Sequence, residues 1–500
     1  MAADKERRNK AIWRIALVVQ ILAIVAAGVL AAANVITWKE GEPVRTYGLE
    51  YDAFSGELDF TAFSADEAIA KAADAERIKG AKSVKLDLSD WTAKQALEFR
   101  NACPDLKIDA AGKIMLNGDE AEDLLKLREA MPEAAYDGTV RFEGTEIPLR
   151  GGTLDLSQMP KEGFPLLMKL TDGTVELDSV DFGREEGGHT RLADVHAFMQ
   201  ANPDTQVSYG FSAFGKSIDV HDEVLDLNHI PMTDQGAEVR DIIACMPDLT
   251  YLDMDFCEVD DDHMAAIRED FPDITVDWRI WFGDRFTART DETRILASAS
   301  WLGGELTPEN TQGLKYCTKM KYLDIGHMNY LKDISFTAYM PDLEVLIIIM
   351  GNVTDISPLA NCKHLEFLEI FTNDITDLSP LAELHELKHL NICYNKNLSD
   401  MTPLYGLTQL ERLWIGRYTQ IPREQIQHFK ELAPGCVVNT TCGNPHYNWR
   451  WYGDPEDDEP KDFTPRYRLL MKQLGYIGRK YSMPWNDPKY YPHDNNAGNN

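Results

Sequence analysis

Residues 365–404 read LEFLEIFTNDITDLSPLAELHELKHLNICYNKNLSDMTPL, and this stretch decides the fold. In it, and from about Leu314 to Pro422 around it, apolar residues return to the same place every 22 or 23 residues. The repeated pairs are Leu323 and Ile325, Leu346 and Ile348, Leu368 and Ile370, Leu390 and Ile392, and Leu413 and Ile415. Such a period is typical of one strand and one return segment per unit, and each unit buries its apolar side only by stacking on the next. The sequence therefore predicts a solenoid that presents an extended curved surface rather than a closed pocket.

A slower repeat precedes this array. Leu86-Asp-Leu, Leu154-Asp-Leu and Leu225-Asp-Leu recur at intervals of 68 and 71 residues, and each is followed by amphipathic stretches with helical spacing. We therefore predict an α/β protein in which a leucine-rich solenoid with a curved parallel sheet follows irregular α/β repeats. The expected divisions are 41–300 for the irregular repeats, 301–435 for the regular array, 436–486 for an aromatic segment with a short helix, and 487–500 for a disordered tail.

The N-terminus has the pattern of a membrane segment. Residues 1–10 are basic, and the apolar stretch from Ile15 to Ala33 is broken only by Gln20. Nineteen helical residues are about 28 Å long, close to the thickness of a hydrocarbon core of about 30 Å. We predict a transmembrane signal-anchor helix over 11–37, with 1–10 in the cytoplasm and the rest extracytoplasmic. Cleavage after the alanines at 31–33 is the alternative, although the apolar stretch is longer than a usual signal peptide.

Charge and cysteine content limit the function classes. The chain has 50 basic and 82 acidic residues, a net charge of −32, and no basic stripe, so nucleic-acid binding is not expected. Eight cysteines without a C-x-x-C pair do not indicate a disulfide scaffold. Cys317 and Cys362 occupy a core position of the repeat, and only Cys436 and Cys442 are spaced for a local disulfide.

The repeats resemble those of bacterial, internalin-like leucine-rich repeat proteins. The resemblance rests on Val353-Thr-Asp-Ile-Ser-Pro-Leu and Ile375-Thr-Asp-Leu-Ser-Pro-Leu, and on the pattern L-x-x-L-x-L-x-x-N that ends at Asn373 and Asn395. It implies a ladder of asparagines that satisfies backbone groups at each strand-to-loop turn, and a concave face that binds partners. The sequence contains no Gly-rich phosphate loop, nucleophile elbow or convincing catalytic triad, and we predict that the protein is not an enzyme. The ladder asparagine is replaced at Met328 and Tyr418, and Asn352 lies one place late. No cell-wall sorting signal is visible, so the N-terminal helix would supply the anchor.

Two short motifs have a chemical and a structural interpretation. His385-Glu-Leu-Lys-His389 spells H-E-x-x-H, which binds zinc when it lies on a helix, but here it crosses into a predicted strand, so we interpret it as accidental. Asp260, Asp261, Asp262 and His263 lack the alternate spacing and glycine of a calcium loop, and we interpret this run as a helix cap. No metal or cofactor is expected.

The predicted binding site is the concave face of the regular array. Side chains alternate along a strand, so the residues that flank each inward leucine should point to solvent. The expected partner-binding residues are Tyr322, Asp324, Val345, Ile347, Ile349, Phe367, Glu369, Phe371, His389, Asn391, Arg412 and Trp414. A contiguous apolar and aromatic surface of this kind usually marks an interaction site. The alternative is that the C-terminal segment, rich in Trp449, Trp451, Tyr452, Tyr467 and Tyr476, folds back and covers it.

These observations predict a membrane-anchored, extracytoplasmic protein that binds a protein or glycan partner through this concave face. Two other classes stay open. One is a structural or assembly subunit of an envelope complex, and the other is a zinc hydrolase that uses His385, Glu386 and His389.

Overall fold

The computed structural model describes residues 44–52, 55–283, 285–297, 305–416, 418–440, 469–470 and 473–474. The chain divides into two compact units, 1–220 and 221–500. The predicted segments 1–10, 11–37 and 487–500 lie outside the described residues, as does Cys442. Among the residues that are described, no helix combines the length and the apolar character needed to cross a bilayer.

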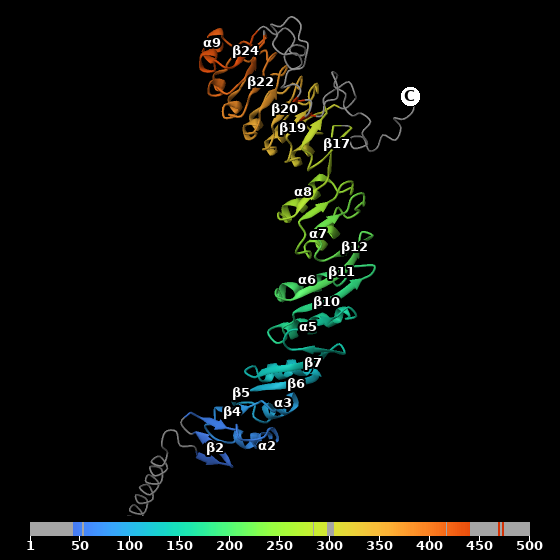
Figure 1. Ribbon diagram of the computed structural model, residues 1–500, viewed down its shortest axis with the longest axis vertical. Helices are drawn as coiled ribbons and strands as arrows, with labels where there is room; N and C mark the ends of the chain where they lie inside the picture. Colours follow the sequence, from blue (N-terminus) through green and yellow to red (C-terminus); the bar gives the residue numbers. More distant parts are fainter. Residues whose placement is uncertain are drawn as a thin grey trace, which may run out of the picture. The chain divides into compact units, whose positions relative to one another are not determined.

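The described residues of unit 1 form three sheets whose longer connections are helical (Figure 1). Its strands are β1 Val44–Thr46, β2 Leu49–Asp52, β3 Glu57–Asp59, β4 Ser83–Asp87 and β5 Lys107–Ala111 in the first sheet, β6 Lys113–Glu120, β7 Ala135–Phe142 and β8 Thr145–Pro148 in the second, and β9 Thr153–Asp155, β10 Ser179–Glu185, β11 Gln206–Ala213 and β12 Lys216–Asp219 in the third. Its helices are α2 Ala65–Glu76, α3 Ala93–Ala102, α4 Ala121–Ala130, η1 Lys161–Gly163, α5 Phe164–Thr171 and α6 Leu192–Ala201.

Unit 2 begins with three parallel strands and a hairpin, and continues into a seven-stranded parallel sheet. The first part comprises β13 Val224–Asp226, α7 Ala237–Ile243, β14 Tyr251–Asp253, α8 Asp261–Asp270, β15 Thr275–Asp277, β16 Arg279–Phe282 and β17 Phe286–Arg289. The seven strands are β18 Arg294–Leu296, β19 Tyr322–Asp324, β20 Val345–Ile347, β21 Phe367–Glu369, β22 His389–Asn391, β23 Arg412–Trp414 and β24 Val437–Asn439. They lie side by side in chain order (Figure 1).

The length of the return segment explains why the two parts of the chain have different periods. In the described part of the regular array the returns are short 3₁₀ helices, η3 Gln312–Tyr316, η4 Ser335–Tyr339, η5 Ser357–Asn361, η6 Ser379–Leu381 and η7 Thr402–Gly406, whereas the last return is an α-helix, α9 Arg423–Leu432. Between β9 and β11, and between β13 and β15, each return is instead an α-helix, and an antiparallel β-hairpin partner follows. Each slow repeat therefore consists of two strand–helix units followed by a β-hairpin.

The Leu-Asp-Leu motif marks the end of a parallel strand. Both leucines point into the core, where Leu225 and Leu227 are buried. The carboxylate of Asp226 between them accepts a hydrogen bond from the amide of Asn228 at 2.9 Å, which closes an Asx turn and ends the strand. The same bond forms at Asp87 and Asp155. The motif therefore encodes a strand end in each slow repeat.

The Ser-Pro motif starts the two 3₁₀ returns η5 and η6. Asp355 accepts a hydrogen bond from the amide of Ser357 at 2.8 Å, and Asp377 does the same for Ser379. The proline that follows lies in the first turn, where its fixed φ suits a helix and its missing N–H costs nothing. Sequence and local geometry therefore agree in these repeats.

The predicted asparagine ladder is confirmed at two positions. Asn395 is fully buried; its amide donates to the carbonyls of Ile370 and Ile392, and its Oδ1 accepts from the amide of Ile375 at 3.1 Å. Asn373 makes the equivalent bonds one unit earlier, including those from Gly351 and Val353. Because backbone groups at a buried turn must be satisfied, these side chains hold neighbouring units in register.

Candidate binding surfaces

The strand register assembles the predicted partner-binding residues into rows across the sheet. Tyr322, Val345, Phe367, His389 and Arg412 are paired neighbours in the first row. The second row runs through Asp324, Ile347, Glu369, Asn391 and Trp414. We call these rows, with Ile349 and Phe371 just beyond the strands, the array face.

The predicted exposure of the array face is wrong. Every one of its side chains is buried, with at most 4% of its surface exposed, apart from Tyr322 and Arg412, which are half-buried. Alternation along the strand sets the direction of a side chain but not what lies above it. Because these exposures refer to the single chain, atoms of the same chain cover the face.

Equivalent positions on other strands show what an uncovered face looks like. Val224 begins β13 as Val345 begins β20, yet its side chain is 55% exposed. Lys85 and Asp87 on β4, and Thr153 and Asp155 on β9, are also exposed. The same strand geometry therefore leaves this face open elsewhere, and the burial is specific to the regular array.

Four residues of the C-terminal segment are described, and they lie at the β18–β19 edge of the array face. The guanidinium of Arg294 donates to the carbonyl oxygen of Gln473 at 3.4 Å. Burial raises the pKa of Tyr322, and a hydrogen bond between its hydroxyl and Glu344 acts in the same direction, while a bond with Gln473 opposes them. Leu470 and Leu474 are buried, whereas Leu469 is exposed. This segment is therefore packed against the chain at one edge of the face.

The array face contains polar donors that no described residue satisfies. Nδ2 of Asn391 and Nη1 of Arg412 are both buried, and none of the described side chains or carbonyls accepts a hydrogen bond from them. Asn391 has no exposed surface, although its Oδ1 accepts from the amide of Cys393 at 3.1 Å. Leaving a buried donor unsatisfied costs about 1–3 kcal/mol, so these two sites favour an added acceptor.

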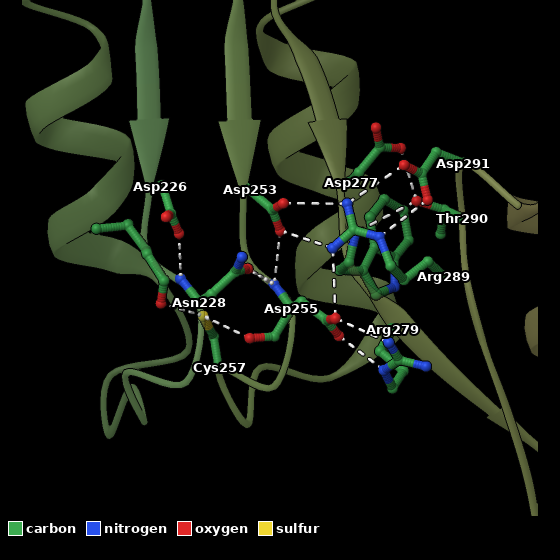
Figure 2. A network of polar contacts seen from close by, with 12 residues as sticks. Asp226, Asn228, Asp253, Asp255, Cys257, Asp277, Arg279, Arg289, Thr290 and Asp291 are labelled. Carbon is green, nitrogen blue, oxygen red and sulfur yellow. Dashed lines mark hydrogen bonds and ion pairs between the residues drawn. The ribbon is translucent and has the colours of Figure 1, made fainter. Parts of the chain in front are cut away.

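A second set of polar residues ties the hairpin β16–β17 to the parallel strands before it (Figure 2). Arg279 binds the carboxylate of Asp255 in a bidentate pair, with both N–O distances at 2.8 Å. Arg289 binds both oxygens of Asp253 at 3.0 Å and also reaches Asp255 at 3.3 Å. Although burial opposes its charge, hydrogen bonds to Asp253 and Asp291 raise the pKa of Arg289. We call Asp253, Asp255, Arg279 and Arg289 the Asp–Arg cluster.

This cluster is built from elements that the sequence analysis did not connect. The side chains of Arg279 and Asp255 are only 7% and 11% exposed. Asp255 is also held by the side-chain oxygen of Asn228, which accepts from its amide at 3.0 Å. Each charge is matched by an opposite one, so the cluster acts as a structural clamp between strands and hairpin. The signal in the sequence that could have found this cluster is an acidic residue two places after the end of a strand, as Asp255 is after Asp253.

A pocket of about 610 Å³ opens beside the cluster. Its wall includes the stacked rings of His229 and Phe256, 4.8 Å apart, and the exposed ring of Trp281. Arg279 lies over the ring of Phe256 at 4.6 Å. Glu258, Asp260 and Asp261 add carboxylates. Aromatic rings beside carboxylates suit a ligand that has both an apolar face and hydrogen-bond donors.

The acidic run beside this pocket caps a helix. Asp260 is the N-cap of α8, and its carboxylate accepts a hydrogen bond from the amide of His263 at 2.9 Å. The predicted cap is therefore confirmed, and the helix begins within the acidic run, at Asp261. Burial raises the pKa of Asp261, and a bond from the indole of Trp278 opposes this. In the described ranges, no three His, Cys, Asp or Glu side chains converge on a possible metal site.

The H-E-x-x-H residues do not share a helix. His385 and Glu386 lie in a turn, and His389 begins β22. Each has its own partner: His385 pairs with Glu383, Glu386 with His364, and His389 with Glu411. The helical geometry that brings two imidazoles of this motif onto one metal ion is not formed.

The cysteines of the array behave as core residues, as predicted. Cys317 and Cys362 have no exposed surface, and burial raises the pKa of Cys362 to about 12. Burial likewise raises the pKa of Cys436 to about 12, but its predicted disulfide partner lies outside the described residues. A buried thiol with a high pKa is chemically inert, which fits a packing role.

A scan against protein-family models and a search of curated proteins find no match for this chain. Among solved structures, internalin F of Listeria monocytogenes is 17% identical over 73% of this chain and 75% of its own, with a TM-score of 0.24. Internalin C2 of the same species is 20% identical over 50% of this chain and 81% of its own, also with a TM-score of 0.24. A leucine-rich repeat protein of Leptospira interrogans is 12% identical, covers 76% and 99% of the two chains, and has a TM-score of 0.21.

The regular array has a leucine-rich repeat fold. Its geometry combines parallel strands at a 22 to 23 residue period, 3₁₀ returns and a buried asparagine ladder. In this fold the strands form one continuous sheet, and each apolar position is completed by the next unit.

Proposed function

We propose that this leucine-rich repeat protein is not an enzyme but binds a protein or glycan partner through its array face. One observation carries the proposal: Asn391 and Arg412 direct buried donors into this face, and no described residue supplies an acceptor. Backbone carbonyls of a peptide and hydroxyl oxygens of a glycan are acceptors of the required kind. Arginine and aromatic residues such as Trp414 are also the types that most often dominate binding energy.

The proposed location follows from the N-terminal sequence alone. We infer that residues 11–37 anchor the protein in a membrane and that the repeats face the extracytoplasmic side, because the basic residues of 1–10 favour the cytoplasm. A net charge of −32 disfavours nucleic acid as the partner.

The test compares two arginine variants of the full chain as bait in pull-downs from detergent-solubilised membranes and from extracellular material. Arg412→Glu changes a half-buried side chain on the array face, whereas Arg423→Glu makes the same charge change at the exposed start of α9. Phe367 and Phe371 are less suitable because they are fully buried, so charged replacements would unfold the array.

We expect wild type and Arg423→Glu to retain a partner and Arg412→Glu to lose it by about tenfold or more, since a reversed charge at a buried contact typically costs several kcal/mol. Equal recovery by all three baits would contradict the array face as the binding site. It would direct attention to the pocket beside Trp281, whose aromatic and acidic wall is the second candidate surface.

The two other classes predict different results. A subunit of an envelope complex would co-purify from membranes with a constant set of proteins in fixed ratio. A zinc hydrolase would contain stoichiometric zinc that is lost when His385 and His389 are replaced, yet the turn and strand on which they lie do not favour this outcome.

A further inference from the structure

The pocket beside the Asp–Arg cluster has the size of a small-molecule site. Its wall comes from the loop after β13, the loop after β14 and the strand β16 with the residue before it, all within unit 2. A volume of about 610 Å³ lies within the range of about 300–1,000 Å³ that is typical of ligand pockets. Met254, Cys257 and Trp278 are buried parts of this wall. A molecule that enters the pocket therefore meets apolar as well as polar side chains.

Aromatic rings line the pocket because of the repeat geometry. His229 and Phe256 each stand three residues after the end of a parallel strand, so they occupy the same place in neighbouring units, and their rings stack at 4.8 Å. Trp281 alternates on β16 with Ile280 and Phe282, which are buried, and its own side chain is 46% exposed. The faces of such rings are negatively polarised and attract a cation that lies within about 6 Å.

The pocket wall carries an excess of negative charge. Glu258, Asp260 and Asp261 contribute three carboxylates, and Arg279 contributes the one guanidinium among the lining residues. The charge of Arg279 is already compensated, because its guanidinium binds both oxygens of Asp255. Within the described part of the chain, the exposed carboxylate of Glu258 has no hydrogen bond or ion pair. This carboxylate is therefore available to a charged ligand.

We propose that this pocket binds a small organic cation, an ammonium group with apolar substituents, with Glu258 supplying the opposite charge and Trp281 an aromatic face. Such a ligand benefits both from the charge and from the rings. A neutral sugar could stack on the same ring, but it would gain nothing from the excess charge. A bare metal ion is not favoured, since no three His, Cys, Asp or Glu side chains of the described residues converge.

The experiment uses choline as the probe and its neutral isostere, 3,3-dimethyl-1-butanol, as the comparison. Each is added to the full chain in an uncharged detergent, and its dissociation constant is measured by ligand-observed NMR. The two molecules have nearly the same shape and differ in charge. We expect choline to bind about tenfold more tightly, because cation–π and ion-pair attractions act on choline alone.

Two substitutions separate the contribution of charge from that of the ring. Glu258→Gln removes the charge of an exposed side chain, and Glu269→Gln makes the same change on α8 outside the pocket. Trp281→Ala removes the ring, and Tyr330→Ala removes a similarly exposed ring, also outside the pocket. We expect Glu258→Gln to weaken choline binding about fivefold and to leave the isostere unchanged. Trp281→Ala should weaken both ligands, and the two controls should match wild type.

Three results would overturn the proposal. Choline and its isostere could bind equally, choline could bind Glu258→Gln as tightly as Glu269→Gln, or wild type could bind no choline at all. A further arm titrates methyl β-glucoside, and a sugar that binds more tightly than choline and is lost in Trp281→Ala would identify the pocket as a glycan site instead.

This proposal stands apart from the proposed function, because no lining residue of the pocket belongs to the array face. Arg412→Glu should leave choline binding unchanged while it reduces capture of the partner. Glu258→Gln should have the opposite pattern. Loss of choline binding in Arg412→Glu would contradict a separate site in the pocket.

Discussion

At the scale of single residues, buried polar side chains hold the backbone in place. Asn395 binds two carbonyls and one amide from neighbouring units, so one side chain couples two turns of the solenoid. Glu185 holds the backbone at the start of α6. Its carboxylate accepts hydrogen bonds from the amides of Thr190 and Arg191 and from the hydroxyl of Tyr209, the last at 2.6 Å. Such carboxylates connect the stability of a unit to pH.

Glu185 gives a pH-dependent prediction. Burial opposes the charge of this group, but the hydrogen bonds from Tyr209 and Thr190 outweigh it and lower the pKa of Glu185 from 4.5 to about 2. A depressed pKa contributes stability that is complete above the unfolded value and is lost as pH falls through the folded value. We expect Glu185→Gln to lower the free energy of unfolding at pH 7 and to flatten its decline between pH 5 and pH 2, as measured by urea denaturation.

The exposed neighbour Glu186 is the matched control, and Glu186→Gln should reproduce the wild-type curve. An unchanged acid decline in Glu185→Gln would show that other carboxylates account for it.

At the scale of elements, charges clamp the hairpin β16–β17 to the strands β13–β15. Removing one member of a buried ion pair leaves its partner uncompensated, which typically costs about 3–5 kcal/mol. Asp255 contacts both Arg279 and Arg289, so Asp255→Ala should destabilise unit 2 by about this amount. Hydrogen exchange of β14 and β16, followed by mass spectrometry, measures the effect where it arises.

Asp273 is exposed in a turn between α8 and β15, and Asp273→Ala should change stability by less than about 0.5 kcal/mol. A loss in Asp255→Ala that is no larger than this would mean that the cluster adds no net stability.

At the scale of the whole molecule, the N-terminal segment predicts where the protein is found. If 11–37 is an uncleaved anchor, the full chain should sediment with membranes and resist extraction by high salt, and deletion of 11–37 should release it. Added protease should degrade the repeats of intact cells or spheroplasts while a cytoplasmic marker survives. A soluble full-length chain would refute the anchor, and a mature chain starting after about residue 33 would establish cleavage.

Local repetition explains what could be predicted from the sequence. The units of the array share their apolar positions, and the Ser-Pro return and the ladder asparagine each recur in two of them, so the strands, the core and the direction of each side chain follow from neighbours within about one period. The repeat register also showed that His385 and His389 would not share a helix. These features depend on contacts between adjacent units, which a periodic sequence encodes directly.

Exposure and charge pairing depended on residues far apart in the chain. The array face is buried, although the alternation of side chains along its strands predicted exposure to solvent. The atoms that cover it are not part of the repeat pattern. Tyr322 meets Gln473 across about 150 residues, and Arg289 meets Asp253 across 36. The sequence by itself therefore determined the solenoid and the side of the sheet to which each residue points. Only the tertiary structure decided which of these sides is open to solvent. The reason is that burial depends on non-repeating contacts, which no sequence period encodes.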